Sequence, residues 1–448
     1  MKCYARFVSP PVALLSPLTE ITDVLPAPET PELAGFSLDA PKAGLAAESF
    51  ALDLRGWAAG AASPATHVRL LHDGRLIRRL PVELERPDVA ESLPGVPHAD
   101  HSGFFGTLSA LALSLRFELG LELGLEDRTR VPLATVRGKR APLVSGFEPR
   151  LRPLVLTSMG RTGSTAVVRM LAAHPEVVAY RPFQLEPRVA TYWIGVFRAL
   201  ADPASYRRQL DPTGTLDGDW WLGTQSRLPR PARDPALEPW LDVTAVVELA
   251  RHAQERIEGL YAQVAAAQSR PDASWFVEKY RVDEVPALVL ELYPAAREVI
   301  LVRDFRDMVA SMFSYNEKRG RAGFRRDEAA TDSDYVVTRV GPEADALAEI
   351  WRRRGRQAHL LRYEDLVRRP EETVHALLAH VGLDTSDAVL APMLASLANR
   401  DSGSEGHRTV ADAAESIGRW RRDLSREVVE ACETALGPSL EAFGYEPT

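Results

Sequence analysis

Small residues and a single cation form a loop near residue 160, between an apolar run and a helical segment. Residues 154–156 predict a buried strand, and residues 166–173 have the spacing of a helix. The loop between them reads Met159-Gly-Arg-Thr-Gly-Ser-Thr165. Such a loop can hold a phosphate group, because its glycines let the backbone approach the ligand and the helix N-terminus adds about half a positive charge. Arg161 is its cation, so the segment is a candidate anion site.

The loop differs from the phosphate-binding loop of proteins that bind nucleoside triphosphates. That pattern is G-x-x-x-x-G-K-[ST], and no lysine precedes Ser164 here. The third glycine of the pattern G-x-G-x-x-G is also missing. An ordinary strand-to-helix turn is therefore the alternative for the loop taken by itself.

From residue 150 onward, helical patterns alternate with short apolar strands, which indicates a parallel sheet flanked by helices. Strands are predicted at 154–157, 275–280, 299–303 and 358–363. Helices are predicted at 164–173, 188–210, 236–268, 286–293, 307–315, 344–354, 371–381 and 425–436. Ligands bind at the carboxyl ends of parallel strands, so residues 160–165, Glu278–Lys279 and 303–307 should meet in one crevice. Residues 319–345, with several arginines, are predicted to be a mobile lid or a plain exposed loop.

The first third of the chain has a period of two, which is typical of antiparallel strands. Residues 1–45 contain many prolines and predict an extended lead-in. Residues 46–145 predict a β-sandwich, in which Asp73-Gly74 is the strongest hairpin signal. Three residues of this region can ligate a metal, although a solvated loop is the favoured interpretation: His98, Asp100 and His101.

Composition limits the class of protein. The 448 residues predict two or three domains, and 45% hydrophobic with 26% charged residues is typical of a soluble globular protein. The net charge of 54 − 62 = −8 argues against a nucleic-acid partner. Two cysteines, Cys3 and Cys432, predict a reducing compartment and no metal cluster. The sequence shows neither a signal peptide nor a membrane span, so a cytoplasmic location is expected.

A second candidate anion site follows much later in the chain. Arg303 ends a predicted strand, and Ser311 lies in the next helix. Taken alone, Arg303 could instead pair with Asp304 or Asp307, and Ser311 could lie on the helix surface. The segment 299–312 resembles the 3′-phosphate-binding motif of sulfotransferases that use 3′-phosphoadenosine 5′-phosphosulfate (PAPS), and 161–175 resembles their 5′-phosphosulfate-binding segment. Similarity continues in the family's late strand and in its nucleotide-covering loop, at 362–366, 407–409 and 416–420. The resemblance covers about 150–445 and is of the bacterial type.

The resemblance implies in-line transfer of a sulfuryl group from PAPS, as co-substrate and without a metal, to an acceptor hydroxyl. It implies that Arg161 neutralises charge on the bridging oxygen, that Arg303 binds the 3′-phosphate, and that Lys279 contacts the transferring group. The implied nucleotide-binding residues are Gly160, Arg161, Thr162, Gly163, Ser164, Thr165, Arg303, Ser311, Gly418 and Arg419. The acceptor is expected to be a small molecule or a glycan, with carbohydrate or glycoconjugate favoured.

The general base is less clearly marked. Many family members have a Glu shortly after the first helix, where this chain has Arg181. Glu186 is the nearest substitute, and Glu278 is the second candidate, for which a structural ion pair is the alternative. Phe305 also occupies a position that is often Pro in the family.

The expected fold class is α/β, with a P-loop-like parallel sheet flanked by helices at 150–448, preceded by the smaller antiparallel β-sandwich at 46–145. Two other functions stay open. One is a nucleotide-dependent kinase on the same frame, which the missing lysine opposes. The other is a non-catalytic glycan-binding protein on a degenerate sulfotransferase fold. The oligomeric state stays open as well.

Overall fold

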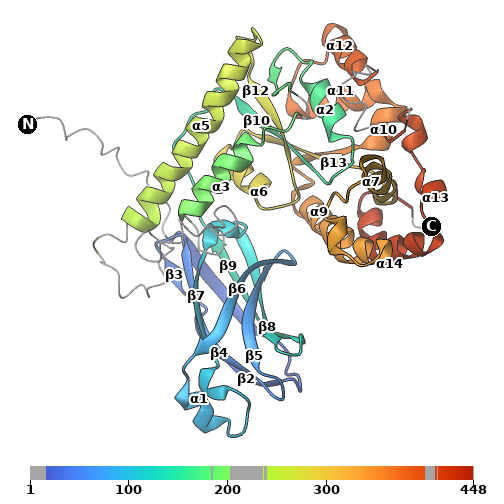
Figure 1. The fold of residues 1–448 in the computed structure, drawn as a ribbon. Helices are drawn as coiled ribbons and strands as arrows, with labels where there is room; N and C mark the ends of the chain where they lie inside the picture. Colours follow the sequence, from blue (N-terminus) through green and yellow to red (C-terminus); the bar gives the residue numbers. More distant parts are fainter. Residues whose placement is uncertain are drawn as a thin grey trace, which may run out of the picture. The chain divides into compact units, whose positions relative to one another are not determined.

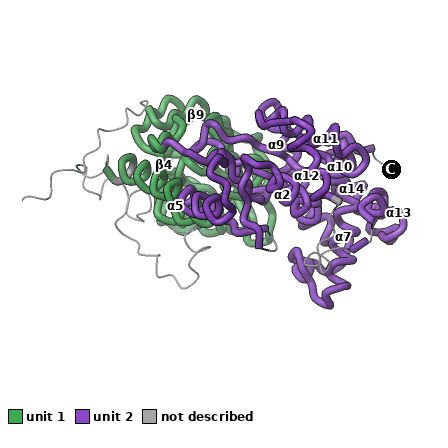
Figure 2. Tube along the Cα trace, turned by 90° about the horizontal axis from the view of Figure 1, so that it is seen from above, with its two compact units in different colours: residues 1–147, 192–255 green, residues 148–191, 256–448 purple. Residues whose placement is uncertain are grey.

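The structure, a computed structural model, describes residues 17–182, 185–201, 236, 240–398, 409–410 and 412–446. The chain divides into two compact units, coloured separately in Figure 2: Met1–Phe147 with Tyr192–Glu255, and Glu148–Thr191 with Arg256–Thr448. Of the described residues, 192–201, 236 and 240–255 thus fall in the first unit, whereas the sequence placed them in the α/β domain at 150–448. No helix in these described ranges is long and apolar enough to cross a membrane.

In the described part of the first unit, nine antiparallel strands form one sheet (Figure 1). The strands are β1 (Thr19–Pro26), β2 (Leu33–Ala40), β3 (Ala46–Ala47), β4 (Ala51–Gly60), β5 (Ala65–His72), β6 (Arg75–Leu84), β7 (Gly103–Ser109), β8 (Arg116–Leu125) and β9 (Arg130–Arg140). Neighbours follow the order β2-β4-β7-β6-β5-β8-β9-β1-β3. One short helix, α1 (Pro87–Ser92), follows β6.

Strict alternation explains why these strands form. In β8, Phe117, Leu119 and Leu121 are buried, whereas Glu118 and Glu122 lie on the other face. The prediction of antiparallel strands is confirmed, and their packing as a two-layer sandwich stays a prediction.

The predicted lead-in over residues 1–45 is wrong for its second half. Strand β1 pairs with β9, and β2 pairs with β4 at the edge of the sheet. The sequence signal is short, because apolar and polar residues alternate only over residues 36–40 and β2 is only partly buried along most of its length.

The described part of the second unit has a five-stranded parallel sheet in the order β11-β12-β10-β13-β14. These strands are β10 (Arg152–Ser158), β11 (Val177–Val178), β12 (Trp275–Tyr280), β13 (Arg297–Val302) and β14 (Ala358–Arg362). Its helices are α2 (Ser164–Leu171), α6 (Val285–Leu292), α7 (Phe305–Arg319), α8 (Asp332–Tyr335), α9 (Gly341–Arg354), α10 (Tyr363–Arg368), α11 (Pro370–Val381), α12 (Asp387–Ala398), α13 (Trp420–Asp423) and α14 (Arg426–Ala442). Two more helices, α3 (Val189–Ala201) and α5 (Ala245–Ala267), contain residues of both units.

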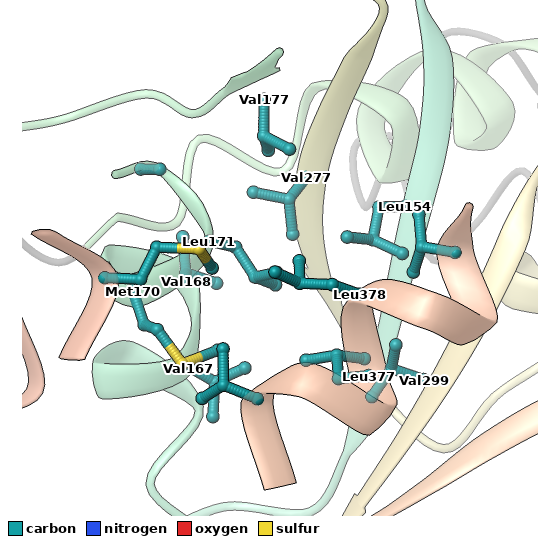
Figure 3. Packing of buried hydrophobic residues seen from close by; sticks show 14 of the residues in the cluster. Leu154, Val167, Val168, Met170, Leu171, Val177, Val277, Val299, Leu377 and Leu378 are labelled. Carbon is teal, nitrogen blue, oxygen red and sulfur yellow. The ribbon is translucent and has the colours of Figure 1, made fainter. Parts of the chain in front are cut away.

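Helices cover both faces of the parallel sheet, and β13 shows this directly. Val299 and Leu301 face a cluster that includes residues of α2, α11 and α12, part of which is drawn in Figure 3. Ile300 and Val302 face a second cluster with residues of α7, α9 and α14. The expectation of a parallel sheet flanked by helices is confirmed.

The segment 319–345 is largely helical, so the prediction of a lid or loop is wrong for its second half. The Thr331 hydroxyl caps α8 by accepting a hydrogen bond from the Asp334 amide, at 3.0 Å. A π-helical turn at Val336–Val340 then leads into α9. Tyr335, Val336 and Val340 are buried in the second cluster, which gives this segment its tertiary support.

Other boundaries differ by small amounts. The predicted helix 188–210 is α3, with 202–210 outside the described residues, and 236–268 is α5 after a π-helical turn at Trp240–Thr244. His407, quoted for the family resemblance, also lies outside the described residues.

Candidate functional site

The loop after β10 has the backbone conformation that a phosphate cradle needs. Gly163 caps α2 with a φ of 89°, a left-handed conformation that favours glycine. A Cβ atom at Gly163 would lie 2.7 Å from the ring of Tyr363, so the close approach also requires glycine. Arg161 likewise has a left-handed φ of 66°. Since Ser164 begins α2, the loop and the helix N-terminus face the same ligand position.

Lys279, near the end of β12, contacts this loop with its side chain. Its ammonium donates to the Thr165 hydroxyl at 2.7 Å and to the Glu186 carboxylate at 2.9 Å. Burial lowers the pKa of Lys279, and Glu186 opposes this shift. The structure therefore joins Lys279 to Thr165, as expected from the parallel sheet, and brings Glu186 to the same place.

Glu186 lies between two cations. Besides Lys279, the Arg188 guanidinium contacts its carboxylate at 3.1 Å. Burial pushes the pKa of Glu186 upward, but Lys279 and Arg188 outweigh it and hold the pKa below its ordinary value. At neutral pH this carboxylate is ionised and able to accept a proton. Leu185 and Arg188 have left-handed φ values of 60° and 51°, and such backbone outliers concentrate at functional sites.

Glu278 does not reach the crevice, contrary to its nomination as a base. Its fully buried carboxylate accepts hydrogen bonds from the Tyr261 hydroxyl (2.5 Å) and from the amides of Val189 (2.8 Å) and Ala190 (3.1 Å). Glu278 therefore holds the N-terminus of α3. The reason is geometric: successive residues of a strand point to opposite faces, so Glu278 and Lys279 cannot share one site.

This placement makes Glu278→Ala a stability variant. Its loss leaves a buried hydroxyl and two amides without their acceptor, which should lower the free energy of unfolding by about 3 kcal/mol in urea titration. Glu430→Ala is the control, with an expected loss below about 1 kcal/mol, because Glu430 and its ion-pair partner Arg426 are both exposed. Equal losses in the two variants would contradict the assignment.

The second anion site is built at the end of β13. Arg303 is 5% exposed and donates to the carbonyl oxygens of Arg161 (3.2 Å) and Ser416 (2.7 Å), while its guanidinium lies 4.8 Å from the centroid of the Tyr363 ring. Its buried Nε has no acceptor, and no described residue places a carboxylate within ion-pair distance. A buried cation without a counter-ion is costly, so this charge suits an anionic ligand.

Further cations and hydroxyls lie beside Arg303. The Nε of Arg161 donates to the Ser311 hydroxyl at 3.2 Å. Burial lowers the pKa of Arg161 to about 10, and the neighbouring Arg303 and Arg419 add to the shift. The gathering of these three guanidinium groups points to a ligand with several negative charges.

Arg419 is held by the loop before α13 and by α7. Its guanidinium contacts the carboxylate of Asp423 at 2.6 Å and the hydroxyls of Thr409 (2.7 Å) and Ser314 (2.8 Å). Ser311 also lies 3.4 Å from the Thr409 hydroxyl. Helix α7 and the loop therefore enclose the second anion site together.

Asp307, considered in the sequence only as an alternative partner of Arg303, fixes the backbone on both sides of Arg419. One carboxylate oxygen accepts the Gly418 amide at 2.6 Å and the other accepts the Trp420 amide at 2.9 Å. The Gly418 amide is thus engaged with Asp307, whereas it was expected to face the nucleotide. The spacing of Asp307, Ser311 and Ser314 places them on one face of a helix, but it does not reveal the amides that Asp307 binds.

The described residues contain no group of three or more His, Cys, Asp or Glu side chains able to hold a metal ion. Asp100 and His101, considered as ligands above, contact each other at 2.9 Å in a 3-10 turn. The geometry instead offers two candidate anion sites, connected through Arg161, which contacts Arg303 by its carbonyl and Ser311 by its side chain.

Comparison with known proteins identifies the class. Residues 153–387, slightly more than half of the chain, match the model of the sulfotransferase family, and the chain belongs to this family. The resemblance seen in the sequence is thereby confirmed.

Curated relatives match over short stretches. Carbohydrate sulfotransferase 7 of Mus musculus is 33% identical over 134 residues, which cover 26% of this chain and 26% of the relative. The same protein of Rattus norvegicus is 36% identical over 91 residues, which cover 19% and 18%. The chain thus spans about a quarter or less of the length of these relatives.

Solved structures of sulfotransferases are similar at low identity. The sulfotransferase domain from the curacin biosynthetic pathway is 15% identical, with a TM-score of 0.37 over 67% of this chain and 100% of the domain. Sulfotransferase STF9 from Mycobacterium avium is 18% identical, with a TM-score of 0.35 over 67% and 78%. Mouse sulfotransferase SULT7A1 complexed with PAP is 10% identical, with a TM-score of 0.35 over 66% and 86%.

Proposed function

We propose that this protein transfers the sulfuryl group of PAPS to a hydroxyl group on a carbohydrate or glycoconjugate. The observation that carries the proposal is Arg303, a buried cation without a carboxylate partner among the described residues, which contacts the loop of the first candidate anion site at Arg161. PAPS carries negative groups at its 3′ and 5′ ends, and the two candidate anion sites, connected through Arg161, would take one end each. Membership of the sulfotransferase family supports the same chemistry.

Each anion site would take one end of the nucleotide. The amides and hydroxyls of residues 160–165 would bind the 5′ end, as a helix N-terminus binds phosphate. Arg303, Ser311 and Arg419 would bind the 3′-phosphate, with the guanidinium groups giving bidentate contacts. The contact of Arg161 with Ser311 would then give way to contacts with the ligand.

The transfer step would use Glu186 as the base. The acceptor hydroxyl gives its proton to the Glu186 carboxylate while its oxygen bonds to sulfur, and the bond from sulfur to the bridging phosphate oxygen breaks. Charge then develops on that bridging oxygen, where Lys279 supplies preorganised positive charge and Arg161 would add its charge after leaving Ser311. Lys279 links the loop at 160–165 to the proposed base, because it contacts both Thr165 and Glu186.

Calorimetry tests the choice of nucleotide and separates the kinase alternative. We expect adenosine 3′,5′-bisphosphate, the product that remains after transfer, to bind more tightly than ATP or AMP, because only the bisphosphate fills both anion sites. Tight binding of ATP with no binding of the bisphosphate would overturn the proposal and favour a kinase.

Asp307 should matter for nucleotide binding through Arg419. In Asp307→Asn the amide group would face one of the two backbone N–H groups with its own N–H, so one hydrogen bond is lost and the backbone around Arg419 shifts. We expect about tenfold weaker binding of adenosine 3′,5′-bisphosphate in calorimetry. Asp345→Asn is the control, since Asp345 accepts a hydrogen bond from Ser439 elsewhere in the fold. Unchanged affinity in Asp307→Asn would refute the positioning role.

A further inference from the structure

Charged side chains on one face of the antiparallel sheet follow a rule. On this face, opposite the buried residues, acids and bases stand across from each other on neighbouring strands. Glu118 faces Arg137 at 2.7 Å, and Glu20 faces Lys139 at 3.0 Å. Such pairs stabilise a sheet, whereas like charges directly opposite destabilise it.

The rule is broken where Arg116 stands across from Lys139, which is itself paired with Glu20, and again where β6, β5, β8 and β9 lie side by side. Arg79 stands directly across from Arg69, whose other neighbour and ion-pair partner is Glu122. In the next row His67 stands beside Gly124, and Arg130 stands on the far side of that glycine. Neither Arg79 nor Arg130 makes an ion pair within the part of the chain that the structure describes. We call His67, Arg69, Arg79 and Arg130 the basic face.

The three arginines of the basic face all act electrostatically on His67. Strands lie about 4.8 Å apart and alternate residues about 7 Å apart, so the basic face spans about 15 Å. Burial lowers the pKa of His67, and Arg79, Arg69 and Arg130 each lower it further. The sheet thus maintains repulsion among these groups, and an anion bound between them would relieve it.

His67 has a fixed orientation on this surface. A Cβ atom at Gly124 would lie 2.5 Å from the ring, so the glycine leaves space for the imidazole. The Thr66 hydroxyl donates its proton to the Gly124 carbonyl at 2.9 Å and lies 2.8 Å from Nδ1 of His67. Because a hydroxyl has one proton, Nδ1 donates to Thr66, which leaves Nε2 as an acceptor.

We propose that the basic face binds an anionic oligosaccharide. Arg79 and Arg130 contact its carboxylate or sulfate groups, and Nε2 of His67 accepts a hydrogen bond from a sugar hydroxyl. Charge complementarity selects the anion, and the choice of a glycan rests on the proposed function, in which the acceptor is a carbohydrate. The site lies in the first unit and adds a binding function to the transfer activity.

Binding of the full-length chain to dextran sulfate oligosaccharides, measured by calorimetry against uncharged dextran, tests the proposal. We expect binding of the sulfated probe only, with at least about tenfold weaker binding in Arg79→Ala/Arg130→Ala. The matched control is Arg116→Ala/Arg137→Ala, which removes the same charge from β8 and β9 and should change affinity less than about twofold.

Equal losses in both double variants, equal binding of uncharged dextran, or equally tight binding of duplex DNA would overturn the proposal. Titration of the same samples with adenosine 3′,5′-bisphosphate keeps the two proposals separate. If the wild-type chain binds dextran sulfate but not adenosine 3′,5′-bisphosphate, only the transferase proposal is contradicted.

Discussion

Arg303→Ala is expected to weaken binding of adenosine 3′,5′-bisphosphate on the order of 10²-fold, while AMP binding changes less than about threefold. AMP lacks the 3′-phosphate, so it does not use the positive charge that Arg303 holds at the end of β13. The variant also removes a buried cation that has no carboxylate partner among the described residues, so its thermal stability should not collapse. Calorimetry with both nucleotides measures the difference.

Arg303→Lys is the matched variant for this prediction. It keeps the charge but loses the two-pronged guanidinium that reaches both Arg161 and Ser416, so its affinity should fall between wild type and Arg303→Ala. Equal weakening of bisphosphate and AMP binding in Arg303→Ala would contradict a specific role in binding the 3′-phosphate.

Glu186→Gln is expected to lower kcat by about 10²–10⁴-fold with nearly unchanged affinity for the bisphosphate, because an amide cannot accept the acceptor's proton. Steady-state transfer assays measure kcat. Glu278→Gln is the isosteric control: it replaces the other nominated acid, which holds the N-terminus of α3, and should leave kcat close to wild type.

The pH profile gives this prediction a second readout. Glu186 must be ionised to act, and its pKa lies below its ordinary value of 4.5, so activity should persist down to that range and fall as pH drops through the pKa. In Lys279→Ala the carboxylate loses its nearest cation, its pKa rises, and the acid limb of kcat/KM moves to higher pH. An acid limb that stays in place in Lys279→Ala, or full activity of Glu186→Gln, would exclude Glu186 as the base.

The parallel sheet was predictable because apolar periodicity is a local property. Strands β10, β12, β13 and β14 follow from short apolar runs, and their shared direction places the loop at 160–165, Lys279 and Arg303 at one edge. Strand β11 has only two residues and gives no such signal. Helix α12 was missed as well, and it contains Pro392 within its span.

The contacts within the site depend on tertiary geometry that spacing does not encode. Glu186 contacts Lys279 in a segment where Leu185 and Arg188 have left-handed backbone conformations. Leucine and arginine rarely adopt this conformation, so the sequence does not predict it. Glu278 was a candidate base because it lies next to Lys279 in the sequence, although adjacent residues of a strand point to opposite faces. Asp307 meets the amides of Gly418 and Trp420, more than a hundred residues away, so only the folded chain shows its role.

Transfer of labelled sulfate from PAPS to a panel of oligosaccharides tests the central claim most directly. The proposed mechanism predicts label on at least one acceptor, release of one adenosine 3′,5′-bisphosphate for each sulfate transferred, and loss of both products in Glu186→Gln. Bound bisphosphate with no label on any hydroxyl-bearing acceptor, or transfer of phosphate from ATP by the same sample, would contradict it.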